Sequence, residues 1–254
     1  MSTTTFENID NEIPAEAQST AVVPAAKAGT EVVAGDFFSN EGLEGEFNKG
    51  DLKIPGLNLV QGVGPLSEFF TPGQVIYNGE EVIYTPPGPN QPVPAPVKIT
   101  VVKARKFLQE KLPYGSEVMP RRFNTEQEAR GAGLYPLWEK NDAPKDAGFF
   151  QPVLDCQVLI EGDPEKNSSW PLEFEGKVYA MARWYIQSVA YNVAAKTILT
   201  ATQLGGLRNH LFEGYWLLAP KREKVGQNLV WLPRIRWGNK HTPEFIEWVK
   251  SQLA

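Results

Sequence analysis

Cysteine and histidine are scarce in this chain of 254 residues, which contains only Cys156, His210 and His241 of the two types. A single cysteine cannot form an intramolecular disulfide, so the fold must depend on its hydrophobic core, and the chain is long enough to bury one. These residues are too few for a zinc site of cysteine and histidine ligands within one chain. We therefore expect neither a metal nor another cofactor.

Long apolar segments are also missing. No run of 18 apolar residues occurs, and the start, Met1 to Glu7, lacks the basic and apolar regions of a signal peptide. We expect no association with a membrane and a cytoplasmic location, which for a viral protein would be the host cytoplasm. The composition, 42% hydrophobic and 22% charged, is typical of globular proteins and excludes disorder of the whole chain.

Motifs of common enzymes are missing as well. The chain has no phosphate-binding loop, no Gly-x-Ser-x-Gly elbow and no His-Glu-x-x-His pair. One pattern points to catalysis, because Asp155 on a predicted strand, followed by Glu175 and Lys177, resembles the site of nucleases in which two carboxylates hold Mg²⁺ and a lysine orients water. Glu175 and Lys177, however, flank Gly176 in a predicted tight turn, whereas this chemistry needs them along a strand. We expect no enzyme and keep the nuclease as the alternative.

Charge is divided unevenly along the chain. Residues 1–50 contain nine acidic and two basic residues, a charge of −7, whereas the whole chain carries −5, so residues 51–254 carry the difference, +2. We expect residues 1–35, which have few large apolar side chains, to form a disordered acidic arm. The arm either solubilises the protein or competes with a polyanion for a basic groove.

The predicted elements favour an α+β chain that is mainly β. Tight hairpins are predicted around Asn78–Gly79 and Gly176–Lys177, because asparagine and glycine tolerate positive φ. The pattern from residue 153 onward predicts strands at 153–160, 172–175 and 178–187, a helix from Ser188 to a stop at Gly205–Gly206, strands at 215–222 and 229–237, and a helix starting at Thr242. Five strands with a helix between the third and the fourth is the order of an OB-fold, although other α+β domains share it.

We therefore expect an OB-like antiparallel barrel with a helix between strands three and four and a C-terminal helix. It would form a single nucleic-acid-binding domain over residues 36–254. A proline-rich stretch, 85–96, is expected to be an extended loop of this domain, because proline fixes φ and lacks an N–H donor.

Basic and aromatic residues recur together on the predicted strands. On strand 178–187, Tyr179, Arg183 and Tyr185 share the face opposite the apolar one, so that bases could stack on the rings while the guanidinium meets a phosphate. The full set of candidate nucleic-acid-binding residues is Lys103, Arg105, Phe107, Arg121, Arg122, Tyr179, Arg183, Tyr185, Arg234, Arg236 and Trp237. Arg234 and Arg236 are assigned to one face with Trp237 alongside. The alternative is an ordinary aromatic ladder beside solvated basic residues.

Three short segments resemble uncharacterised bacteriophage proteins, some of which are suspected of binding single-stranded DNA. The segments are Asp51–Gln61, Phe149–Val153 and Thr242–Ile246, and the resemblance extends over about residues 50–254. It implies a viral accessory of replication or recombination that coats single strands. Such proteins often end in an acidic tail, whereas this chain ends in Val249–Ala254, which contains no acidic residue.

We thus expect a non-enzymatic bacteriophage protein that binds single-stranded DNA during DNA replication or DNA recombination. Lysine and arginine would neutralise phosphates, and aromatic rings would stack on bases. Its expected partners are single-stranded nucleic acid, a second copy of the chain and replication or recombination proteins. The alternatives are the Mg²⁺-dependent nuclease and a phage structural or protein-interaction module.

Overall fold

The structure is a computed structural model that describes residues 54–113, 116–204, 207 and 211–253. The predicted acidic arm, residues 1–35, and the predicted helix stop, Gly205–Gly206, lie outside the described residues. Most of the predicted domain, 36–254, is described from residue 54 onward.

Long strands dominate the fold. The strands are β1 (Leu57–Leu59), β2 (Val75–Tyr77), β3 (Glu81–Tyr84), β4 (Val97–Lys111), β5 (Arg122–Phe123), β6 (Leu134–Pro136), β7 (Gly148–Gly162), β8 (Leu172–Phe174), β9 (Lys177–Gln187), β10 (Gly214–Val225) and β11 (Asn228–Lys240). The helices are α1 (Glu126–Gly131), α2 (Ser188–Ala190), α3 (Lys196–Leu204) and α4 (Pro243–Leu253), and a π-helical turn, Tyr191–Ala195, joins α2 to α3. The expectation of a mainly β chain with antiparallel strands is confirmed.

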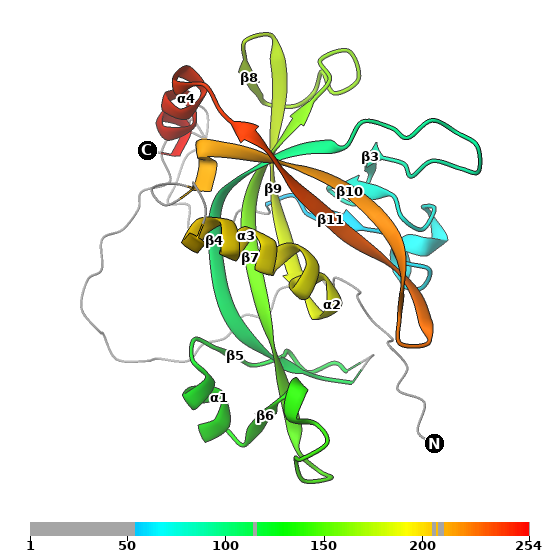
Figure 1. Ribbon diagram of the computed structural model, residues 1–254, viewed down its shortest axis with the longest axis vertical. Coiled ribbons are helices and arrows are strands. Elements are labelled where there is room, and N and C mark those ends of the chain that lie inside the picture. Colours follow the sequence, from blue (N-terminus) through cyan, green and yellow to red (C-terminus); the bar gives the residue numbers. More distant parts are fainter. Residues whose placement is uncertain (1–53, 114–115, 205–206, 208–210, 254) are drawn as a thin grey trace, which may run out of the picture.

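The larger sheet has the order β11-β10-β4-β7-β9-β8, and every pair along this path is antiparallel. Its long strands curl around α2 and α3 (Figure 1). The short β5 pairs with β4, and β6 pairs in parallel with β7 at the lower end of the molecule. Apolar residues alternate along the long strands β4, β7, β9, β10 and β11, so each of these gives one face to the main core. We call this the inner face and its opposite the outer face.

A small sheet, β1-β2-β3, covers the open side of the curl. The backbone N–H of Arg183 on β9 donates to the carbonyl of Pro55 at 2.7 Å, and Gly56 forms a parallel bridge with Arg183. The side-chain amide of Gln61 bonds both backbone groups of Trp231 on β11, at 2.9 and 3.1 Å. Residues 55–61 thus occupy exposed edges of both β9 and β11, which would otherwise present unpaired donors and acceptors.

Both predicted hairpins are confirmed. Asn78 and Gly79 adopt φ of 53° and 75° between β2 and β3, and Glu175 and Gly176 adopt 49° and 72° between β8 and β9. The second turn therefore begins one residue earlier than predicted. The order of three strands, a helix, two strands and a helix is also present.

The second of the five predicted strands was, however, misassigned. Residues 172–175 were counted as a strand of the main series, but β8 has only three residues and pairs only with β9 at the end of the sheet. The place beside β7 belongs to β4, which has 15 residues. Pairing between distant segments decides this, and a local pattern cannot show it. Within the described residues β9 and β11 form no ladder with each other, so no closed barrel is observed.

Helix α4 covers only the upper part of the outer face. Its Phe245 and Val249 pack on Val102, Leu159 and Tyr179 in a second, smaller core. The helix begins as predicted, because the backbone N–H of Phe245 donates to the hydroxyl of Thr242, the N-cap, at 3.3 Å. Among the described residues, no other helix is seen to cover the outer face below α4 (Figure 1).

Glycines permit close aromatic packing on the β10–β11 hairpin. A Cβ atom on Gly214 would lie 2.0 Å from Cη2 of Trp237 and 2.7 Å from the backbone oxygen of Asn239, so Gly214→Ala should lower the free energy of unfolding by about 1–3 kcal/mol. Gly131→Ala is the control, since a Cβ atom there meets no heavy atom within 4 Å, and alanine in α1 should raise stability by up to about 1 kcal/mol. Denaturant titration of both variants checks the contrast, which would be absent if the Trp237 ring simply moved aside.

Candidate nucleic-acid interface

Strands β4, β7 and β9 bring several of the predicted binding residues together on the outer face. The register aligns Lys103 with Gln157, and Gln157 with Arg183. In the next row Arg105 lies beside Asp155, and Asp155 beside Tyr185. Arg122 joins them from β5, where it pairs with Gln109 of β4. We define the basic face by Lys103, Arg105, Arg122 and Arg183, together with the rings of Phe107 and Tyr185.

Guanidinium groups and aromatic rings alternate across this face. The guanidinium carbon of Arg122 lies 5.2 Å from the ring centroid of Phe107, which lies 5.8 Å from the ring of Tyr185. Arg183 lies over the other end of the row, 5.6 Å from the Tyr185 ring. Such cation–π contacts fix the orientation of the guanidinium planes. Phe107 is only 4% exposed beneath this cover, so the groups that a ligand would meet first are the cations.

Tyr185 is the half-buried ring of the basic face. Its hydroxyl donates to the side-chain oxygen of Gln109. Burial raises the pKa of Tyr185 to about 12, so the phenol stays neutral at physiological pH. A base can stack on this neutral ring beside two guanidinium groups, and the ring adds no charge to the basic face.

One of the four cations is neutralised within the protein. Arg183 donates to both carboxylate oxygens of Asp155, at 2.8 and 2.6 Å. Among the described residues, Lys103, Arg105 and Arg122 have no ion-pair partner, and Arg105 donates only to the neutral side chain of Asn124 at 3.1 Å. The positive charge available to a ligand therefore comes from these three side chains.

Two of the predicted residues lie away from this surface. Tyr179 shares the outer face of β9 but is buried beneath α4, with 4% of its surface exposed, so it is not available for stacking. Arg121 lies on the other side of β5, where it is paired with Glu110 at 2.8 Å and covers the ring of Phe123. Strand alternation separates Arg121 from Arg122 although the two are adjacent in the chain.

The predicted cluster on β11 is divided between two faces. Arg234 and Arg236 share a face, opposite Ala219 and Leu217, but Trp237 alternates to the other face and packs edge-on against Trp216 at 5.3 Å. Trp237 is thus next to the arginines in the chain but on the opposite face of β11. Arg234 is also neutralised, because its guanidinium donates to Glu223 at 2.7 Å. Along the sheet, β11 and β9 are separated by β10, β4 and β7.

The residues of the predicted nuclease site do not converge. Asp155 lies opposite Tyr185, and eight residues of β9, about 26 Å of strand, separate this point from Lys177. Asp155 is held by Arg183, Lys177 is paired with Glu161 at 2.5 Å, and Glu175 lies in the turn. Within the described part of the chain, no group of three or more histidine, cysteine, aspartate or glutamate residues is placed to hold a metal ion.

The buried thiol of Cys156 has a raised pKa because of its burial.

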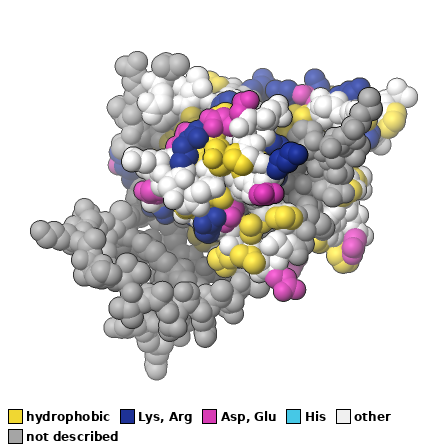
Figure 2. All heavy atoms as spheres, turned by 90° about the horizontal axis from the view of Figure 1, so that it is seen from below, with side chains coloured by type: hydrophobic (Ala, Val, Ile, Leu, Met, Phe, Trp, Pro, Cys, Tyr) yellow, Lys and Arg dark blue, Asp and Glu magenta, His cyan; other side chains and the backbone are white. Residues whose placement is uncertain are grey.

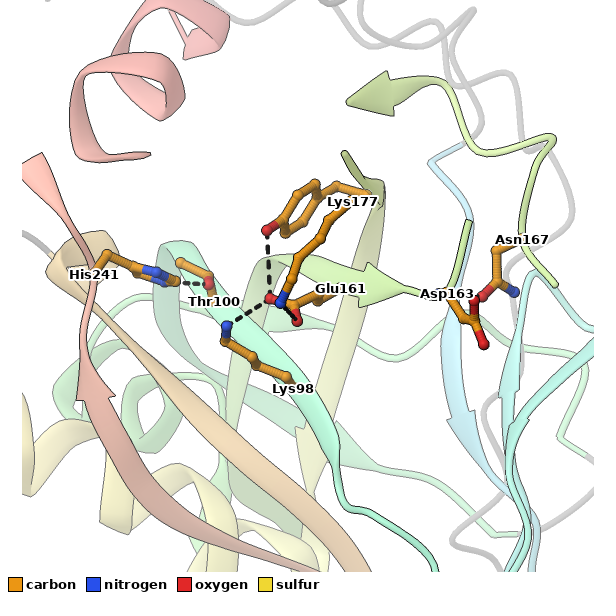
Figure 3. Close-up of polar contacts among 8 residues, drawn as sticks. Lys98, Thr100, Glu161, Asp163, Asn167, Lys177 and His241 are labelled. Atoms are coloured by element: carbon orange, nitrogen blue, oxygen red, sulfur yellow. Dashed lines mark hydrogen bonds and ion pairs between the residues drawn. The ribbon is translucent and has the colours of Figure 1, made fainter. Parts of the chain in front are cut away.

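A polar cluster that the sequence did not reveal lies beside α4, at the ends of β4 and β7 away from the basic face (Figure 3). Glu161 accepts contacts from Lys98 at 2.6 Å, from Lys177 and from the hydroxyl of Tyr179. These contacts outweigh the effect of burial, so the pKa of Glu161 lies below its ordinary value. The carboxylate is therefore occupied by two lysines at pH 7.

His241 connects the start of α4 to the same cluster. Its Nε2 shares a hydrogen bond of 2.7 Å with the hydroxyl of Thr100, and its ring stacks on Phe245 with centroids 3.9 Å apart. Burial, and then the charge of Lys98, lower the pKa of His241 to about 4. The imidazole is thus neutral at physiological pH and supports the docking of α4.

Comparison of the chain with protein-family models, with curated proteins and with solved structures finds no match. Within the described residues, none of the helices has the length and apolar character that crossing a membrane requires.

The lowered pKa of His241 leads to a prediction about acid stability. A histidine whose pKa is lower in the folded state than in the unfolded state destabilises the fold as pH falls from about 6.5 to about 4, because the unfolded chain binds the proton more readily. His241→Gln retains hydrogen-bonding groups without titrating, so its unfolding free energy should change less over this range. The slopes of unfolding free energy against pH for the wild type and for His241→Gln should differ by less than about 1.4 kcal/mol per pH unit, the limit for one proton. Denaturant titrations at several pH values measure it, and parallel curves for the two proteins would contradict the assignment.

Proposed function

We propose that the protein binds single-stranded DNA on the basic face and acts as a non-enzymatic coating protein, in the manner of bacteriophage replication or recombination accessories. The observation that carries this proposal is the group of three neighbouring cations, Lys103, Arg105 and Arg122, that have no ion-pair partner among the described residues. Cations kept free of carboxylates are suited to phosphates, whose neutralisation releases counterions and dominates the affinity for nucleic acids.

The connectivity supports an OB-like fold as part of this proposal. When β4, β7, β9, β10 and β11 are counted as strands one to five, the sheet contains the pairings 1–2, 2–3, 1–4 and 4–5 of an OB barrel. Only the pairing of strands three and five is absent from the described residues, and residues 55–61 bond to both of those strands instead. In OB-folds the face of strands two and three, with the loops between strands one and two and between four and five, binds oligonucleotides.

The basic face agrees with this expected binding surface. Its residues lie on strands one to three of this count, and Arg122 comes from the connection between strands one and two. The connection between strands four and five is the β10–β11 turn, which follows the basic residues Lys221, Arg222 and Lys224. A strand crossing the basic face would therefore meet positive charge from the sheet and from the connection that carries Arg122.

The pairing of Arg183 with Asp155 limits the charge of the face. Asp155 holds the guanidinium against the ring of Tyr185, and the carboxylate repels phosphates that approach too closely. We therefore assign phosphate contacts first to Lys103, Arg105 and Arg122, and stacking to the half-buried ring of Tyr185. The alternative of a Mg²⁺-dependent nuclease is not favoured, because Asp155 lies far from Glu175 and Lys177.

The salt dependence of binding tests the proposal. The double variant Lys103→Gln/Arg105→Gln should weaken binding to a single strand and lower the slope of log affinity against log salt by about 0.7 for each lost phosphate contact. The control Arg121→Gln/Lys250→Gln also removes one arginine and one lysine, but both are paired with glutamates away from the basic face, at 2.8 and 2.7 Å. Its slope should remain that of the wild type.

Gel-shift titrations at several salt concentrations, with single-stranded and duplex oligonucleotides and with and without Mg²⁺, provide the measurement. Equal slopes for the two double variants would remove the basic face from the account. An unretarded strand would support a structural or protein-interaction module, and a shortened strand in Mg²⁺ would support the nuclease.

A further inference from the structure

An exposed tryptophan lies on the connection between β4 and β7. Trp138, in the 3₁₀ turn Leu137–Glu139, is 62% exposed, although tryptophan is normally among the well-buried residues. Its ring meets the buried ring of Phe150 edge-on, with centroids 6.0 Å apart and planes at 86°. One edge of the indole is therefore anchored while most of the side chain remains open to solvent.

The basic face extends along β4 toward this turn. Lys111 lies an even number of residues from Lys103 and Arg105, and the register from Lys103 to Lys111 is regular, so all three share the outer face. Lys140 directly follows the 3₁₀ turn of Trp138. Lys111 lies opposite Phe149 of β7, and Phe149 lies opposite Tyr135 of β6, the strand that leads into the 3₁₀ turn. The lower end of the basic face thus lies at the same end of the sheet as the turn that carries Trp138.

The acidic residue next to Trp138 does not oppose this charge. Glu139 is bound by Arg130 at 2.6 Å, and Arg130 is itself held by Glu126 at 2.8 Å. Two further carboxylates, Asp142 and Asp146, follow with Lys145 in the same loop, so the loop itself is not basic. Seen from below, hydrophobic side chains are exposed at this end between lysine and arginine side chains (Figure 2).

We propose that the indole of Trp138 stacks on an unpaired base of a strand whose phosphates lie along the basic face. This inference rests on the proposed function and names, in addition to Tyr185, a residue that makes the site selective for single strands. Every base has a π face that an aromatic ring can cover, but in a duplex these faces are stacked on neighbouring base pairs and are not available. The contact at Trp138 is therefore made only with an unpaired strand, whereas the phosphate contacts are made with either form.

The test compares two substitutions that keep the contact with Phe150 but differ in their ability to stack. Trp138→Leu keeps an apolar side chain and loses the π face, and Trp138→Phe keeps both. The probes are an oligothymidylate of about 30 nucleotides, an abasic oligonucleotide with the same number of phosphates, and a duplex. Phe69→Ala is the control, because Phe69 is also highly exposed but lies beside the small sheet.

We expect Trp138→Leu to weaken binding to oligothymidylate between about fivefold and about 150-fold, with an unchanged salt slope, and to leave binding to the abasic strand and the duplex unchanged. Trp138→Phe should recover most of the loss, and Phe69→Ala should bind as the wild type does. Circular dichroism establishes that each variant is folded. If Trp138→Leu and Trp138→Phe are equally stable, a difference in their affinity for oligothymidylate reports the loss of the π face.

The remaining outcomes distinguish the two proposals. Binding of oligothymidylate by Trp138→Leu at wild-type strength would overturn the stacking role and leave the basic face intact. Equal losses for the oligothymidylate and the abasic strand would also overturn it, because the effect would then not depend on bases. A wild-type protein that binds none of the three probes would overturn the proposed function, and the role of Trp138 with it.

Discussion

The pairing of β4 with β7 determines where the residues of the proposed site lie, and a single bulge in it determines which way they point. Val97, Ile99 and Val101 alternate into the main core, and the register then shifts between Val101 and Lys103. Because of the extra residue, Val102 and Lys103 both lie on the outer face, and the alternation continues with its parity reversed. A regular strand would have pointed Lys103, Arg105 and Phe107 into the core.

The bulge also divides the outer face into two regions with different roles. Val102 packs under α4 with Leu159 and Tyr179, where the outer face is apolar and closed. From Lys103 downward the face is polar and carries cations. Among the described residues Lys103, Arg105 and Arg122 have no carboxylate partner, and Arg122 and Arg183 are positioned over aromatic rings. Half-exposed ion pairs contribute at most about 1 kcal/mol, so the pair of Arg183 and Asp155 acts more to orient the guanidinium than to stabilise the fold.

Local features of the fold could be predicted from the sequence. The hairpin turns, the N-cap at Thr242 and the apolar face of β9 depend on residues close together in the chain, and the structure confirms them. Lys103, Arg105 and Phe107 likewise share one face, because all three follow the bulge and the alternation after it is local.

Features that depend on distant segments were not predictable in this way. The central position of β4, the burial of Tyr179 by α4 and the ion pair between β7 and β9 each require the register of separate strands or the docking of a helix. Trp138 was not among the predicted binding residues, because it lies in a short 3₁₀ turn and not on a strand with alternating basic and aromatic residues. The sequence nevertheless shows a tryptophan close to a lysine within a polar loop, which could have pointed to it.

The most direct test of the account is photocross-linking of the full chain to a single strand that contains halogenated uracil, followed by mass spectrometry of the cross-linked peptides. The account predicts cross-links to β4, to β9 and to the connection between β4 and β7, because these segments form the basic face and the turn of Trp138. Cross-links confined to α4 or to the β10–β11 hairpin would contradict it, since a strand would then bind to the protein without crossing the basic face.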